Sequence, residues 1–115
     1  MTDAFSDQAV KYVGEYAPKA KDGEPFFLYL AYTAPHWPLH AREQDIDKYK
    51  GRYKAGWDSL REERHRRQIE LGIVDKRWPL TSRDSGVPGW ADAPDKDWQQ
   101  RRMEVYAAMV DRLDQ

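Results

Sequence analysis

The stretch Pro25-Phe-Phe-Leu-Tyr-Leu-Ala-Tyr-Thr-Ala-Pro-His-Trp-Pro-Leu-His40 decides how the rest of the chain is interpreted. Its first half, Phe26–Tyr32, is a continuous apolar and aromatic run without polar alternation. Such a run, bounded by prolines, predicts a short strand buried on both faces. Two histidines, His36 and His40, follow it among prolines. Because open α/β sheets place active-site residues at the carboxyl ends of their strands, the stretch predicts a scaffold strand that leads into a catalytic turn at His36.

Length and composition narrow the classes of protein. A chain of 115 residues is one domain at most. Its net charge of −1 gives no reason to expect nucleic acid or an anionic membrane surface as a partner. No apolar run approaches the roughly 20 residues of a membrane span. The chain has no cysteine, which excludes a disulfide, a thiolate zinc site and a thiol nucleophile within it.

Three segments carry a helical pattern. The first, at about residues 4–17, has its apolar residues on one stripe and is expected to end at Pro18. A second helix is expected at about 59–71, behind a cap at Asp58-Ser59, and its dense charges predict a largely solvated surface. A third, at about 96–113, has a clear apolar stripe and is expected to be capped by Asp95 or Asp97. The intervening segments are expected to be long loops, with a turn of helix near Asp45–Tyr49 in the first of them.

The predicted strand has no partner in the sequence. Ile73–Val74 and Leu80–Thr81 are too short to serve as neighbours. Buried backbone N–H and C=O groups without hydrogen-bond partners cost on the order of a few kcal/mol each. The pattern therefore predicts an α/β fold of which residues 1–115 are an internal segment, with one core strand and about three helices.

The histidines are the residues that could carry chemistry. His36 and His40 are four apart, but Pro35 and Pro38 forbid the regular helix that a His-x-x-x-His metal site requires. A loop bracketed by prolines holds a side chain in one orientation, which suits substrate binding. From the residues alone, the simpler interpretation is favoured, in which His36 only satisfies loop carbonyls. His65, between two arginines, is expected on the surface.

Four blocks of the chain, in order, resemble type I sulfatases, the arylsulfatase family with an alkaline-phosphatase-like three-layer α/β fold. Phe26–His40 looks like the family's core strand and proline-rich histidine turn, and residues 2–10 look like the helix before it. Residues 49–73 are similar to an insertion of bacterial arylsulfatases. Residues 102–113 look like the helix that precedes a strand with late metal ligands.

The resemblance implies roles for two residues. In the family, the histidine of a His-aromatic-Pro context binds the sulfate ester and assists the leaving oxygen, and here that residue is His36, in His36-Trp37-Pro38. As an imidazolium it would donate charge-assisted hydrogen bonds to a sulfate oxygen, and as a general acid it would protonate the leaving oxygen. His40 is the second substrate-binding candidate, at the mouth of the pocket.

The resemblance also implies calcium and a formylglycine. This chain has neither the motif in which formylglycine is made nor the acidic residues that hold the calcium. The family makes formylglycine within a Cys/Ser-x-Pro-x-Arg motif, and that motif is absent. The acidic residues that hold calcium in the family have no matching positions, so no residue is assigned to a metal. We therefore expect the nucleophile and the metal to come from the remainder of the sulfatase domain, and the segment alone to be inactive.

Two alternatives remain open at this point. A sister enzyme of the same fold that hydrolyses phosphate or phosphonate esters would share the strand and turn, because phosphate and sulfate are both tetrahedral oxyanions. The segment that resembles the arylsulfatase insertion favours sulfate. A non-enzymatic interaction fragment with a sulfatase-like segment is the other alternative, and stable self-association would support it.

Overall fold

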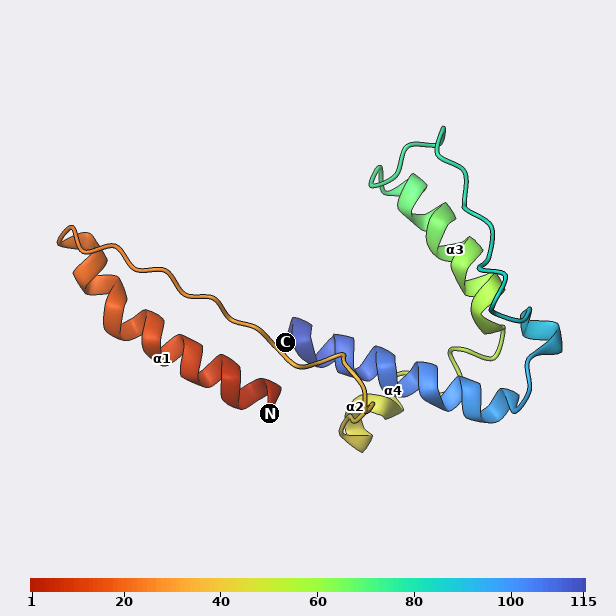
Figure 1. Cartoon of the computed structure of the whole chain (residues 1–115), viewed down its shortest axis with the longest axis horizontal. Coiled ribbons are helices and arrows are strands. Elements are labelled where there is room, and N and C mark those ends of the chain that lie inside the picture. Colours follow the sequence, from red (N-terminus) through yellow and green to blue (C-terminus); the bar gives the residue numbers. More distant parts are fainter.

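The computed structural model describes residues 1–115 and consists of helices joined by long loops (Figure 1). The three predicted helices are present, although their bounds differ from the prediction. A short helix overlaps the turn of helix expected near Asp45–Tyr49, and a 3₁₀ turn is added. The elements are α1 (Thr2–Lys21), α2 (Glu43–Asp47), α3 (Gly56–Glu70), η1 (Trp90–Asp92) and α4 (Lys96–Asp114).

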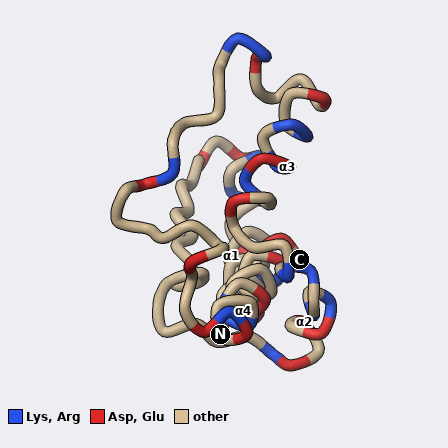
Figure 2. The backbone as a smooth tube through the Cα atoms, turned by 90° about the vertical axis from the view of Figure 1, so that its right-hand side faces the viewer, with Lys and Arg blue, Asp and Glu red and all other residues tan.

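The molecule is extended, with principal dimensions of 60 × 38 × 25 Å. Its radius of gyration is 19.3 Å, whereas a compact domain of this length has about 13 Å. Only 8 of the 115 residues are buried, and acidic and basic residues are interspersed along the chain (Figure 2). The structure therefore has a thin core that sits mainly between α2 and α4, at Ile46, Ala108 and Met109. No helix has the length and apolar character needed to span a membrane.

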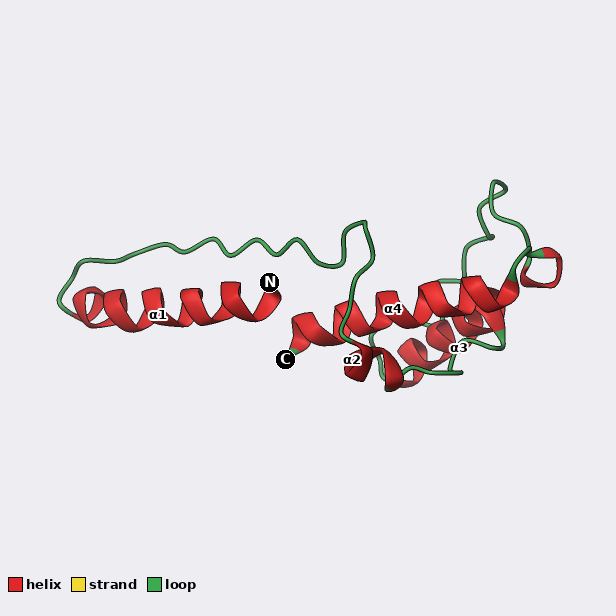
Figure 3. Cartoon of the chain, turned by 90° about the horizontal axis from the view of Figure 1, so that it is seen from below, coloured by secondary structure: helices red, strands yellow, loops and turns green.

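The predicted strand at Phe26–Tyr32 is wrong, and with it the predicted α/β fold. Residues 1–115 contain no strand, and this segment runs as an extended loop back along α1 (Figure 3). No backbone group of residues 25–32 takes part in a backbone–backbone hydrogen bond. A strand is defined by pairing with a neighbour. The apolar run was predicted as a strand buried on both faces, but nothing in this chain pairs with it.

Side chains, and not backbone groups, hold the extended segment to α1. Tyr16 and Phe26 lie with ring centroids 6.0 Å apart. Tyr32 lies 6.5 Å from Phe5 by the same measure, and its hydroxyl shares a 2.6 Å hydrogen bond with Ser6 Oγ. Because side chains of an extended chain alternate in direction, Phe26, Leu28 and Leu30 are less exposed than the residues between them. The residues between them face away, and Phe27 is 89% exposed.

The first helix is longer than the sequence predicts. It continues through Pro18 to Lys21, and Pro18 lies in its last turn. Proline there removes one hydrogen-bond donor near an end that already frays, which costs less than a proline in the middle of a helix. Two residues after the end of α1 comes Gly23, whose positive φ of 94° allows the chain to reverse.

The second half of the chain is assembled around α4. Glu104 on α4 is buried and accepts a hydrogen bond from the Gly51 backbone N–H at 2.7 Å. Elsewhere in this half, α3 packs against η1. The rings of Trp57 and Trp90 form an edge-to-face pair there, with centroids 4.8 Å apart. Asp58 is not the helix cap that the sequence predicts. Its carboxylate instead accepts hydrogen bonds from the backbone N–H of Trp90 and from the Arg83 guanidinium. These two hydrogen bonds lower the pKa of Asp58.

Candidate active site

The turn at residues 33–40 follows directly from the extended segment. The His36 N–H donates to the Thr33 carbonyl at 2.9 Å, which closes the first part of the turn. Pro35 and Pro38 each restrict the backbone φ angle on either side of His36. The local sequence therefore reverses the chain at His36 without help from a regular element.

One nitrogen of the His36 imidazole already makes a hydrogen bond. Nδ1 lies 2.7 Å from the Trp37 carbonyl oxygen. Because a carbonyl oxygen only accepts, the geometry assigns the hydrogen to Nδ1. Nε2 has no partner among the described hydrogen bonds, and the side chain is exposed. In the protonated ring, Nε2 is then the N–H available to donate to an incoming oxygen.

Both predicted histidines line one cavity of about 900 Å³, so the turn brings them together. The start of α1 and Met109 of α4 complete its wall. The other polar side-chain groups of the lining are the hydroxyls of Thr2, Tyr32 and Thr33 and the indole N–H of Trp37, and no carboxylate lines the cavity. A cavity with imidazole and hydroxyl donors and no acidic side chain suits an oxyanion.

Trp37 connects the histidine turn to α4. The Arg102 guanidinium lies 5.1 Å from the centre of the Trp37 ring, within cation–π range. Arg102 is held in turn by Gln99, whose side-chain oxygen accepts at 2.9 Å. Sequence reasoning missed Arg102 and Met109, because no local signal links a helix near residue 100 to a turn near residue 36. Only the apolar stripe of that helix indicated which face would turn inward.

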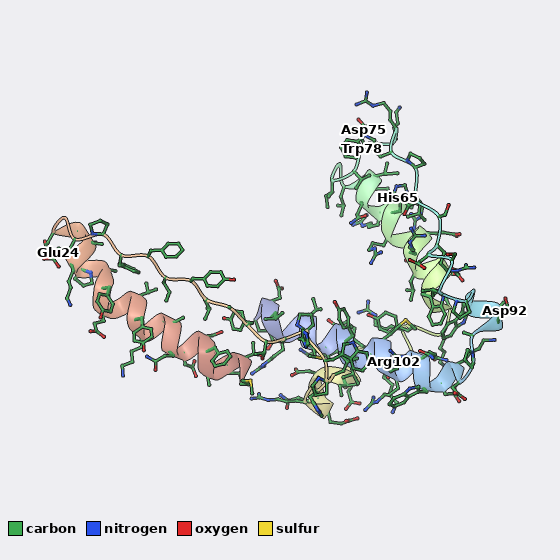
Figure 4. All side chains as sticks on the ribbon, in the orientation of Figure 1. Glu24, His65, Asp75, Trp78, Asp92 and Arg102 are labelled. Carbon is green, nitrogen blue, oxygen red and sulfur yellow. The ribbon has the colours of Figure 1, made fainter.

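His65 belongs to another part of the molecule. It is half-buried on α3, and its Nε2 lies 2.9 Å from the Trp78 carbonyl (Figure 4). The expected surface position is thus only partly correct. This histidine lines neither the His36 cavity nor its rim.

The carboxylates of this chain do not fit a calcium site. No group of three or more metal-ligating side chains gathers in the structure. Asp45 is buried with one oxygen atom that lacks a hydrogen-bond partner, which makes it the best candidate for a ligand. However, the Lys48 ammonium lies 3.4 Å from the other Asp45 oxygen and 2.6 Å from Asp111. The hydrogen bond to Asp111 raises the pKa of Lys48, so a fixed cation already occupies the space between these carboxylates.

Comparison with known proteins places the chain in a family. The sulfatase family model matches residues 1–115. An uncharacterised sulfatase of Schizosaccharomyces pombe is 43% identical over 94 residues, which cover 79% of this chain and 17% of the relative. An arylsulfatase of Klebsiella aerogenes is 31% identical over 114 residues, or 97% of this chain and 25% of the relative. The chain thus spans a quarter or less of the length of these relatives. Because the family model matches the chain from end to end, this protein belongs to the sulfatase family.

Proposed function

We propose that residues 1–115 are a segment of a sulfatase catalytic domain that hydrolyses a sulfuric ester, and that His36 is its contribution to catalysis. The observation that carries the proposal is the His36 cavity, which has imidazole and hydroxyl donors and no carboxylate. Relatives of this chain are named sulfatase and arylsulfatase, which supports a sulfate ester over a phosphate or phosphonate ester as substrate.

The chemistry follows from the single free nitrogen of the ring. With Nδ1 hydrogen-bonded to the Trp37 carbonyl, protonated His36 presents Nε2–H to the ester. It donates first to a sulfate oxygen, which stabilises the negative charge. As the bond between sulfur and the bridging oxygen breaks, the electron pair stays on that oxygen, and Nε2 supplies the proton that makes it an alcohol or phenol. His40, at the same cavity, binds the substrate without proton transfer.

Two groups of the reaction lie outside this segment in the proposal. Formylglycine supplies the nucleophile in the family and calcium stabilises its charge, and residues 1–115 fit neither. The remainder of the domain would provide both and would cover exposed apolar side chains such as Phe27 and Tyr29. The segment alone is therefore inactive.

The test replaces His36 in the full-length sulfatase that carries this segment. We expect His36→Ala to lower turnover of an aryl sulfate by at least about 10²-fold, the low end of general acid catalysis. His40→Ala should raise KM and leave kcat nearly unchanged. His65→Ala is the matched control, because this imidazole is bound to a carbonyl elsewhere on the molecule.

Three outcomes would overturn the proposal. Near-normal turnover by His36→Ala removes this residue from catalysis. Faster hydrolysis of the matching aryl phosphate than of the aryl sulfate changes the substrate class. Turnover by residues 1–115 alone contradicts the division of the site between this segment and the rest of the domain.

A further inference from the structure

A second cavity, of about 660 Å³, lies between α4 and the segment that leads into α3. It shares only Trp37 with the His36 cavity. Five of its twelve lining residues are aromatic, and we refer to it as the aromatic groove, after Trp37, Tyr49, Tyr53, Trp57 and Tyr106.

Neighbouring groups hold two of the aromatic side chains in place, and one of these groups, Arg102, itself lines the groove. Trp57 donates from its indole N–H to the Pro88 carbonyl at 3.0 Å, and its ring packs against Trp90. Trp37 is stacked against the Arg102 guanidinium on the opposite side. Both indoles are thus fixed before any ligand arrives. Trp37 is nevertheless 60% exposed and Tyr106 48% exposed, so their faces are accessible.

The charges of the groove all have one sign. Arg64 of α3 and Arg102 of α4 are its only charged residues, and no carboxylate lines it. Neither arginine takes part in any of the ion pairs of the structure, whereas seven of the nine other arginines do. Arg102 uses one nitrogen to bind Gln99, which leaves further N–H groups for a ligand. Figure 4 shows Arg102 on α4, well away from the loop at Asp75 and Trp78.

We propose that the aromatic groove binds a planar aromatic anion, with its ring between the aromatic side chains and its negative group at Arg64 and Arg102. Aromatic walls alone would accept any apolar group by burial and ring stacking. Two guanidinium groups without acidic partners favour a carboxylate, sulfonate or sulfate on that ring, because the fork of donors matches their oxygens. This site goes beyond the proposed function, since it does not use His36.

The experiment titrates the full-length protein with 2-naphthalenesulfonate by calorimetry. The variant Arg64→Gln/Arg102→Gln should bind this probe at least about tenfold more weakly, as expected for the loss of charge-assisted hydrogen bonds. Arg77→Gln is the control, because it removes a positive charge from the distant loop. Neutral 2-naphthol and inorganic sulfate should each bind at least about tenfold more weakly than the sulfonate. The naphthol lacks the anionic group, and the sulfate lacks the aromatic ring.

His36→Ala separates this inference from the proposed function. Unchanged binding of the sulfonate by this variant, together with loss in the arginine variant, supports the groove even if His36 has no catalytic role. Loss of binding in His36→Ala alone would assign the probe to the other cavity and overturn the inference. Binding by the arginine variant within about twofold of the unaltered protein, or equal binding of 2-naphthol, would also overturn it.

A measurement on the unaltered protein covers the case in which the arginine variant does not fold. Phenylglyoxal modifies accessible guanidinium groups, and mass spectrometry locates the modified residues. We expect 2-naphthalenesulfonate to protect Arg64 and Arg102 and to leave Arg77 reactive. Absence of this protection contradicts the site. Arginines that resist modification without the probe, in a protein that self-associates by ultracentrifugation, would show that a second copy covers the groove instead.

Discussion

Each half of this chain is stabilised internally by a different kind of contact. In the first, α1 and the segment 25–33 meet only through side chains, such as the Ser6–Tyr32 hydrogen bond and the Tyr16–Phe26 ring contact. In the second, side chains bond to backbone groups of distant segments, as Glu104 does to Gly51 and Asp58 to Trp90. A side chain that satisfies a backbone group fixes the path of the chain, whereas a ring contact allows sliding. The second half therefore carries the more specific tertiary structure.

The largest expected effect tests the close packing of the second half at Gly56. An added Cβ there would lie 2.0 Å from Cγ of Trp90, and the residue has a φ of +79°. We expect Gly56→Ala to destabilise α3 and η1 by about 2–4 kcal/mol, through overpacking and backbone strain together. Urea unfolding, followed by circular dichroism and tryptophan fluorescence, measures it.

Gly72→Ala is the matched control for this substitution. Gly72 also has a positive φ, of +71°, but nothing lies within 4 Å of its Cβ position. Only the backbone strain of a positive φ remains there, which costs about 1 kcal/mol of stability. Equal effects at the two glycines would show that Trp90 does not pack on Gly56.

A smaller effect is expected in the first half, at Tyr32. Tyr32→Phe removes the 2.6 Å hydrogen bond to Ser6 and keeps the ring contact with Phe5. One such bond contributes about 0.5–1.5 kcal/mol. Faster hydrogen exchange of the α1 amides would report the loss. Tyr29→Phe, at a side chain that is 80% exposed, should change nothing, and an equal change at both positions would contradict the pairing of the segment with α1.

The smallest effect concerns the ion pairs that join the two halves. Asp3 of α1 pairs with Arg112 of α4 and with Arg42, and hydrogen bonding to Arg112 lowers the pKa of Asp3 from its ordinary 3.8 to about 2. Because the folded pKa is the lower one, this contribution is present above pH 3.8 and is lost as the pH falls through about 2. The pair is accessible to solvent, which limits its strength.

X-ray scattering at neutral pH checks this connection. Asp3→Asn should increase the radius of gyration, because α1 is released from α4. Asp7→Asn removes the same charge from α1 at a side chain without an ion pair and should leave the dimensions unchanged. If the two variants have the same radius of gyration, the halves are joined by something other than Asp3.

Features that depend on residues close together in the sequence were predicted correctly, and features that depend on distant residues were not. The apolar stripes of α1 and α4 depend on residues three and four apart, and both helices are present. The segment Phe26–Tyr32 was predicted as a strand because its apolar run is the same whether the chain pairs with a neighbour or packs on a helix. Asp58 was predicted as a cap because its place before an apolar residue is typical of one, yet its partners Arg83 and Trp90 lie far along the sequence.

The candidate site shows the same division. The sequence by itself determined the proline-bracketed turn and its two histidines, because proline restricts the backbone wherever it occurs. It also carried enough similarity to identify a member of the sulfatase family. Only the tertiary structure decided that His36 and His40 share a cavity without carboxylates, that Arg102 stacks on Trp37, and that two arginines face an aromatic groove. These depend on how α4 and α3 pack against a turn distant in sequence, and such long-range packing leaves no local pattern among the residues that meet.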